Sequence, residues 1–188
     1  MKFVCTILFL GLSIMASAQR VDFNGGWSHV SGNGGLDGFN VGGSYYVSPK
    51  VSLGFNYDGV YDTSNLGAFS ITNAGEIISK SHLQDFLTGP RIYLPGLFKG
   101  KGKIKGHVLV PFVETQFGET SLYSKLITQQ LGTTKTSDTE FSWLLGGGAD
   151  VNFSSHWAAR INGDLLRTHL ADSGQSRFRL IIGPVFKF

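Results

Sequence analysis

The sequence predicts an all-β protein, an eight-stranded antiparallel up-and-down transmembrane β-barrel. Apolar and polar residues alternate with a period of two along most of the chain, which is the pattern of strands with two unlike faces. The connections between the alternating segments are short and long in turn. The chain also begins with an apolar leader and ends on an alternating segment whose last residue is Phe188. Together these three observations favour a barrel that crosses a membrane.

Residues 1–18 have the features of a secretory signal peptide. Lys2 supplies the positive charge, an apolar stretch follows, and Ala16-Ser17-Ala18 matches the small-residue cleavage pattern. We therefore expect a signal peptide at 1–18 and one barrel domain at 19–188. The only cysteine, Cys5, lies in the leader, so we expect no disulfide, no cysteine-based metal site and no cofactor in the domain.

The composition argues against several other classes. The formal net charge of +3 falls to +2 when Lys2 is removed. No basic stripe accompanies this small charge, so nucleic acid is not an expected partner. No segment after the leader is apolar for long enough to form a spanning helix. Aromatic residues make up 13% of the chain and 26 residues are glycine, which suits strands with a lipid-facing surface and many turns.

The first four alternating segments are predicted strands at residues 21–30, 39–47, 51–61 and 83–94. Each is close to the ~9–11 residues that a tilted strand needs to cross a bilayer. In each one, a row of mostly apolar or aromatic residues recurs at every second position. In chain order the rows are Val21, Phe23, Gly25 and Trp27; Phe39, Val41, Gly43, Tyr45 and Val47; Val51, Leu53, Phe55, Tyr57 and Tyr61; and Phe86, Thr88, Pro90, Ile92 and Leu94.

The last four segments are predicted strands at residues 107–117, 141–153, 157–168 and 177–188. They show the same period, and the terminal segment shows it most clearly because its other face carries the charges. Their rows are Leu109, Pro111, Val113, Thr115 and Phe117; Phe141, Trp143, Leu145, Ala149, Val151 and Phe153; Trp157, Ala159, Ile161 and Leu165; and Phe178, Leu180, Ile182, Pro184, Phe186 and Phe188.

Charged residues occupy the opposite faces of these strands. A Lys or Arg that faces lipid at the membrane midplane costs about 2–4 kcal/mol, so the apolar faces are expected to meet lipid and the charged faces the lumen. Eight strands enclose a lumen that side chains just fill, and charges confined there must pair or keep water. We predict a lumen-plugging ion-pair network of Asp22, Asp58, Asp85, Arg91, Glu114, Asp150, Arg160, Asp164, Arg177, Arg179 and Lys187.

Strand register suggests the partners within this network. A turn about Ser155 would set residues of the sixth and seventh strands opposite each other, and closure of the barrel would bring the last strand beside the first. The alternative is a narrow, gated water path through the same lumen. The expected groupings are Asp150 with Arg160, Lys187 with Asp22, Arg91 with Glu114, and Asp58 and Asp85 with Arg177 and Arg179.

The connections alternate in length, as they do in an outer-membrane barrel with tight periplasmic turns and longer outer loops. Two are short, at 48–50 and 154–156, and four are long, at 31–38, 62–82, 118–139 and 169–176. Both ends of the domain then lie on the periplasmic side. The connection at 95–106 departs from this order, because it is long and carries lysines. We expect a flexible, solvated turn there, and contact of Lys99, Lys101, Lys103 and Lys105 with anionic lipid or cell-wall polymer is the alternative.

An enzymatic role has weak support. His29-Val30-Ser31 faintly resembles the His-x-Ser of outer-membrane lipid A deacylases, but it lies early in the chain and has no evident acidic partner in the sequence. His82, His107, His156 and His169 show no metal-ligand spacing. We expect the protein not to be an enzyme and to hold no metal.

The chain resembles the OmpA/OmpX-like superfamily of eight-stranded outer-membrane barrels over the whole domain. The residues that carry the resemblance are Gly25-Gly26-Trp27-Ser28, Leu36-Asp37-Gly38-Phe39-Asn40, Leu53-Gly54-Phe55-Asn56-Tyr57-Asp58-Gly59, Gly89-Pro90-Arg91, Pro111-Phe112-Val113, Gly146-Gly147-Gly148-Ala149-Asp150-Val151, Ala159-Arg160 with Asp164, and the terminal strand.

The resemblance implies an integral, monomeric protein of a Gram-negative-type outer membrane. Its implied partners are the lipids of that membrane, lipopolysaccharide included, and the barrel-assembly machinery with periplasmic chaperones. The assembly signal would be Ile182, Pro184, Phe186 and Phe188, and Pro184 departs from the usual pattern because proline cannot donate to the strand ladder. The peptidoglycan-binding domain of OmpA is not expected here.

The expected role is structural or surface-interacting, exerted through the long outer loops, because loops on a rigid scaffold commonly carry binding residues. A small gated permeability channel is the alternative, and a lipid-modifying enzyme has less support. A soluble secreted barrel that binds an apolar ligand fits the period of the strands, but it fits neither the terminal Phe188 nor the alternation of short and long connections.

Overall fold

The computed structural model describes residues 21–31, 35–68, 76–95, 103–104, 107–128, 132–169 and 174–188. The predicted signal peptide at 1–18 lies outside these residues, as does most of the lysine-rich connection at 95–106. The strands are β1 (Val21–Val30), β2 (Leu36–Ser48), β3 (Val51–Ala68), β4 (Glu76–Tyr93), β5 (Lys103–Ile104), β6 (His107–Thr128), β7 (Gly132–Asn152), β8 (Trp157–Thr168) and β9 (Gln175–Lys187).

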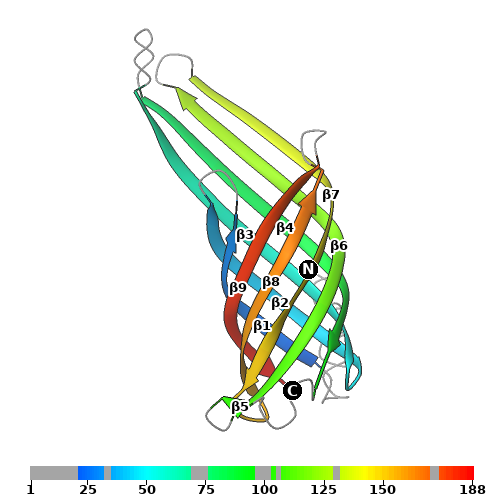
Figure 1. The fold of residues 1–188 in the computed structure, drawn as a ribbon. Coiled ribbons are helices and arrows are strands. Elements are labelled where there is room, and N and C mark those ends of the chain that lie inside the picture. The colour runs from blue at the N-terminus through cyan, green and yellow to red at the C-terminus, as the bar shows by residue number, and fades with distance from the viewer. Residues whose placement is uncertain are drawn as a thin grey trace, which may run out of the picture.

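Eight of these strands form a closed barrel (Figure 1). Each strand pairs antiparallel with its neighbour in the chain, except that β4 pairs with β6, and β9 closes the barrel against β1. The short β5 pairs only with the start of β6. The predicted eight-stranded antiparallel up-and-down barrel is therefore confirmed. Among the described residues, no helix is long and apolar enough to cross a membrane.

The strand boundaries differ from the prediction mainly at one end of the barrel. β1 and β8 have the predicted limits. The predicted long loops at 62–82 and 118–139 are wrong over most of their length. β3 continues to Ala68 and β4 begins at Glu76, while β6 continues to Thr128 and β7 begins at Gly132. These parts have no continuous row of apolar residues at every second position, so the sequence pattern did not predict strands there.

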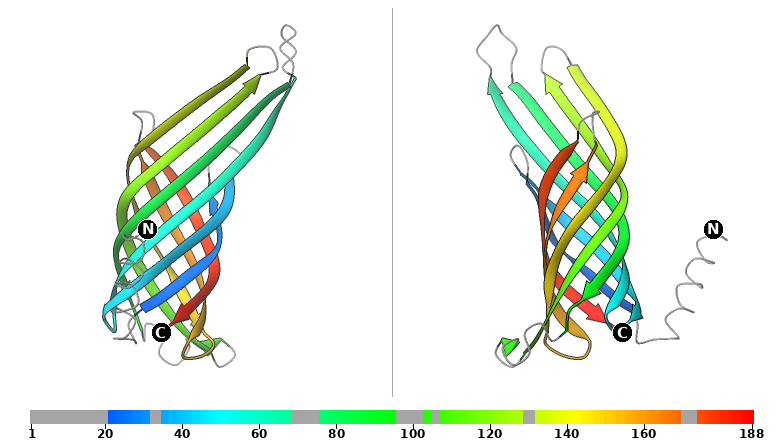
Figure 2. Two further views of the ribbon diagram at one scale, coloured as in Figure 1. Left: turned by 180° about the vertical axis from the view of Figure 1, so that it is seen from behind. Right: turned by 45° about the vertical axis from the view of Figure 1, so that its right-hand side comes forward.

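The four extended strands form a sheet that rises beyond the rest of the barrel (Figure 2). We call residues 62–68, 76–81, 120–128 and 132–141 the protruding sheet, and we call the end that carries it the upper end. β2 stops pairing with β3 at Tyr61, and β8 stops pairing with β7 at Ser142. The lower end carries the C-terminus and the short turns at 48–50 and 154–156 (Figure 1).

The barrel is polar inside and apolar outside. The buried side chains include six carboxylates and the guanidinium groups of Arg91, Arg160 and Arg179. Large apolar side chains lie on the outside of every barrel strand, each 44–59% exposed in the following set. The set takes one residue from each barrel strand, in chain order from β1 to β9: Trp27, Val41, Leu53, Phe86, Val113, Leu145, Ile161 and Ile182.

The ladder between β1 and β9 is interrupted at Pro184. Asn24 pairs with Val185 and Trp27 pairs with Ile182, in one continuous register, but no pairing is formed between these two points. Proline has no backbone N–H to donate, which accounts for the interruption. The departure from the usual terminal pattern thus lies at the strand pair that closes the barrel.

Candidate functional site

The polar interior is the best-defined candidate site, and its lowest layer is centred on Arg160. The Arg160 guanidinium donates from Nε to Asp150 Oδ1 at 2.7 Å and from Nη2 to Asp150 Oδ2 at 3.0 Å. Its Nη1 donates to Asn24 Oδ1 at 3.2 Å, and its Nη2 lies 3.5 Å from Asp22 Oδ2. The Tyr46 hydroxyl donates to the same Asp22 oxygen at 2.8 Å. One arginine on β8 thereby links carboxylates on β7 and β1.

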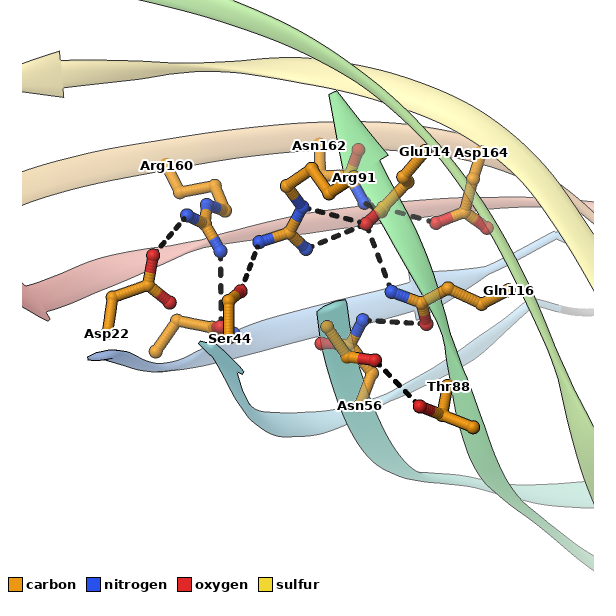
Figure 3. Close-up of polar contacts among 12 residues, drawn as sticks. Asp22, Ser44, Asn56, Thr88, Arg91, Glu114, Gln116, Arg160, Asn162 and Asp164 are labelled. Carbon is orange, nitrogen blue, oxygen red and sulfur yellow. Dashed lines mark hydrogen bonds and ion pairs between the residues drawn. The ribbon is translucent and has the colours of Figure 1, made fainter. Parts of the chain in front are cut away.

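The middle layer is centred on Arg91 and Glu114, which lie opposite each other on β4 and β6 (Figure 3). Arg91 donates from Nε and Nη2 to Glu114 Oε2 at 2.9 and 2.7 Å, and from Nη1 to Ser44 Oγ at 3.0 Å. Gln116 Nε2 also donates to Glu114 Oε2, at 3.0 Å, while Asn162 Nδ2 donates to Oε1 at 2.7 Å. Every oxygen of this buried carboxylate therefore has a donor.

The upper polar layer gathers three carboxylates around Arg179. The guanidinium donates from Nε to both oxygens of Asp164 at 3.1 Å, and from Nη2 to Oδ2 at 3.0 Å. Its Nη1 is hydrogen-bonded to Asp58 and lies 3.7 Å from Asp85 Oδ2. Asp58 and Asp85 are directly opposed on β3 and β4, and Thr120 donates to Asp85 Oδ1 at 2.6 Å. Arg179 is thus the cation that holds these acids together.

Lys187 takes a different partner from the one that register suggested. Its backbone lies opposite Asp22, as expected for closure of the last strand on the first. Its ammonium group, however, donates to Asn152 Oδ1 at 2.7 Å and lies 3.3 Å from Asp150 Oδ2. The long side chain reaches across to β7, where it supplements Arg160 on the same carboxylate.

Arg177 lies above the layer formed by Arg179. Its Nη2 donates to Gln175 Oε1 at 2.6 Å, and no ion pair of Arg177 with Asp58 or Asp85 is formed among the described residues. Arg177 lines a cavity of about 600 Å³ at the upper mouth. The other residues that line this cavity are Ser31, Leu36, Asp62, Ser81, Leu122, Gln175 and Ser176.

Neutral side chains complete the network, and sequence reasoning missed them because it followed charge alone. The Phe112 ring points into the interior, and the guanidinium carbons of Arg91 and Arg160 lie 4.7 and 5.2 Å from its centre. Cations over an aromatic face are attracted to it. The missed polar residues share the inward parity of the charges, which could have identified them; they are Asn24, Asn40, Ser44, Tyr46, Asn56, Tyr93, Gln116, Thr120 and Asn162.

An apolar layer lies inside the barrel between the Arg179 layer and the upper mouth. It was not predicted, because the inward faces were taken as polar along their whole length. Its members also occupy inward-facing positions of their strands, and several of them stand two residues from a buried acidic residue. The buried cluster consists of Val30, Leu36, Val60, Leu83, Leu87, Leu144 and Leu166.

His29 has an acidic partner that the sequence did not reveal. Asp37 lies opposite it on β2, and His29 Nδ1 is 2.9 Å from Asp37 Oδ1. Ser31 Oγ accepts a hydrogen bond from the Phe178 backbone N–H at 2.8 Å, and the His29 ring stacks on Trp27 at 5.7 Å. No hydrogen bond joins His29 to Ser31 in this described region, so the geometry is that of a surface ion pair beside a structural serine.

The residues of the predicted assembly signal lie on the outer face of β9 and at its end. Ile182 and Phe188 are 44% and 41% exposed. Phe186 packs edge-on against Trp157 at 4.9 Å and against Phe188 at 4.8 Å. The terminal strand therefore ends in an aromatic cluster at the lower rim, with Pro184 above it.

These features define a closed eight-stranded antiparallel barrel with a charged interior and an apolar outer surface. Its fold is similar to that of Ail, the attachment invasion locus protein of Yersinia pestis, solved in complex with the heparin analogue sucrose octasulfate. That match has a TM-score of 0.57 and 13% identity, and covers 90% of this chain and 97% of Ail. Neisserial surface protein A matches with a TM-score of 0.53 and 10% identity, over 90% of this chain and 96% of that chain.

Both of these proteins are eight-stranded outer-membrane barrels. At such low identities the likeness shows a shared fold. No protein-family model matches the chain, and no curated protein matches it either.

Proposed function

We propose that this protein is an integral outer-membrane barrel with a structural or surface-interacting role, and that its interior is plugged. The inside-out distribution of side chains carries the proposal. In a soluble barrel the outer surface would be polar, whereas here each barrel strand presents a large apolar side chain to the outside. Monomeric soluble proteins rarely expose continuous apolar surface of this kind, and outer-membrane barrels have such a band facing lipid.

The three charged layers and the apolar layer support a plug rather than a pore. Charged side chains from strands that are not neighbours meet in the interior, as in the contact of Arg160 with Asp22 and that of Arg179 with Asp58. Above them, Leu83 and Leu144, which have no exposed surface, belong to the buried apolar cluster. Water and ions crossing the barrel would have to displace buried ion pairs and then pass an apolar constriction.

The protruding sheet is the surface that supports an interaction role. β3 beyond Tyr61 and β7 before Ser142 are free on one side within the described strands. A free strand edge presents unpaired backbone N–H and C=O groups, to which an extended segment of another chain can add. We therefore assign the proposed surface role to the strands of the protruding sheet, in place of the long loops expected from the sequence.

A matched pair of lysine substitutions tests membrane insertion. Leu145→Lys would place a charge in the apolar belt, and we expect it to cost about 2–4 kcal/mol if that belt faces lipid. Thr133→Lys lies on the same face of β7 near the upper end of the protruding sheet, beyond the apolar belt, and is expected to be nearly neutral. Stability would be measured by the temperature at which the folded form is lost on unboiled SDS gels.

Equal tolerance of the two lysines, with the protein recovered from the soluble fraction, would refute the membrane assignment. The plug is tested separately in planar bilayers, where the wild-type protein is expected to carry no steady current. A reproducible conductance would favour the gated channel instead. Loss of lipid acyl chains that depends on His29 and Ser31 would support the enzymatic alternative.

A further inference from the structure

Three lysines form a row across the protruding sheet. Lys80 on β4 lies opposite Lys125 on β6, and Lys125 lies opposite Lys135 on β7. Residues directly opposite each other on neighbouring strands point to the same face, with Cβ atoms about 4.5–5.5 Å apart. The three ammonium groups are therefore held on one face, the one that continues the outside of the barrel, because Phe86 and Phe141 share their parity.

No carboxylate is seen paired with this row in the described part of the structure. Like charges directly opposite each other on a sheet destabilise it. The ion pairs of the described residues include none of Lys80, Lys125 or Lys135. Asp138 and Glu140 on β7 have the opposite parity, and Glu119 shares the face of the row but lies well below Lys125 on β6. The cost of gathering three cations is therefore one that an external anion would relieve.

The rows below the lysines show at what depth this anion would lie. Tyr61, His82 and Tyr123 form the next row on the same face, and the rings of Tyr61 and His82 stack with centroids 4.2 Å apart. Further down, Phe86 and Phe141 are 57% and 55% exposed and belong to the apolar belt. Passing up the outer face, the apolar belt, in which exposed Glu119 lies between Phe86 and Phe141, is followed by a polar row of Gln84, Ser121 and Thr139, then by the aromatic row and the lysine row.

The step from the aromatic row to the lysine row matches the order of layers at a membrane surface. Aromatic rings with polar edges suit the boundary between hydrocarbon and water. Two residues of a strand span about 7 Å, so the lysine row follows the aromatic row by about one headgroup layer. Lysine stems can lie along apolar surface while their charges reach the phosphates.

We propose that Lys80, Lys125 and Lys135 bind the phosphate groups of phosphorylated lipids in the outer leaflet. The proposal rests on the membrane function proposed above. Continuity of the row with the aromatic row below it favours a lipid headgroup over a soluble polyanion, because the lysines share the face on which the lipids would lie.

Exchange of lipid A between nanodiscs tests the site. The mature protein is placed in zwitterionic nanodiscs, mixed with empty nanodiscs that contain lipid A, and the lipid A that it retains is measured by mass spectrometry. The triple variant K80Q/K125Q/K135Q is expected to bind lipid A on the order of 100-fold more weakly, since each basic residue near an anionic surface contributes about fivefold. The triple arginine variant K80R/K125R/K135R should retain binding, and Lys50→Gln in the lower turn should leave it unchanged.

Two outcomes would overturn the proposal. One is equal retention of lipid A by the wild type and the glutamine variant. The other is binding of soluble polyphosphate, lost in the glutamine variant, with no enrichment of lipid A around the wild type, which would assign the row to a soluble polyanion. Heat-dependent gel migration of each variant separates both outcomes from failure to fold in the membrane, which would instead refute the proposed function.

Discussion

Replacing Arg179 by methionine should be among the most damaging single changes in the interior. Arg179 has no exposed surface and contacts Asp58, Asp85 and Asp164. Methionine keeps much of the volume but leaves three buried carboxylates without their shared cation. Removing one partner of a buried ion pair costs about 3–5 kcal/mol, and the presence of three acids here sets the expectation at the upper end of that range.

Urea unfolding of the protein in lipid vesicles, followed by tryptophan fluorescence, would measure this loss. Arg167→Met is the matched control, because its exposed guanidinium donates to Ser176 Oγ, at 3.1 Å, and exposed contacts of this kind contribute about 0–1 kcal/mol. Adding Asp58→Asn to Arg179→Met should recover part of the stability, since it removes one uncompensated charge. A cost for Arg179→Met no larger than that of the control would refute the view that Arg179 holds the upper layer together.

Three further substitutions test other parts of the structure. Glu114→Gln should cost about 3–5 kcal/mol in the same assay, because it leaves the Arg91 guanidinium buried without its carboxylate; a loss under 1 kcal/mol would contradict this. Gly26→Val should lower the temperature of the gel shift, because a Cβ at that position would lie 2.2 Å from the Ile182 carbonyl oxygen at the closing seam; an unchanged temperature would show that the seam can relax. Phe188→Ala should reduce the heat-modifiable fraction in cells, and an undiminished folded fraction would argue against its role in assembly.

The barrel was predictable from sequence where one face of a strand is apolar and the other polar. β1 and β8 have this contrast over most of their length, and their limits coincide with the predicted ones. The extensions of β6 and β7 lack it because both faces of the protruding sheet lie beyond the apolar belt. Residues such as Thr133, Thr134 and Thr136 still favour strands, but β-propensity alone did not distinguish an extended hairpin from a loop.

The interior was predictable where partners lie directly opposite each other on adjacent strands. The positions of Arg91 and Glu114, and of Asp150 and Arg160, follow from the period of two and the place of the turns. Contacts that cross the barrel depend on side-chain length and on the shear of the sheet, which the sequence does not display. Lys187 illustrates this, because its backbone register matches Asp22 while its ammonium group reaches Asp150.

The separation of interior partners along the chain has a consequence for assembly. Arg160 and Asp22 are 138 positions apart, and Arg179 and Asp58 are 121 apart. An unclosed sheet would leave Asp22 and Asp58 without these partners on the side that later becomes the interior, and bare ions do not enter hydrocarbon at acceptable cost. The pairs between adjacent strands, Arg91 with Glu114 and Arg160 with Asp150, can form before closure. For a barrel in a bilayer, closure of β9 on β1 would therefore complete the neutralisation of the interior, and we expect the nascent sheet to be shielded until its two ends meet.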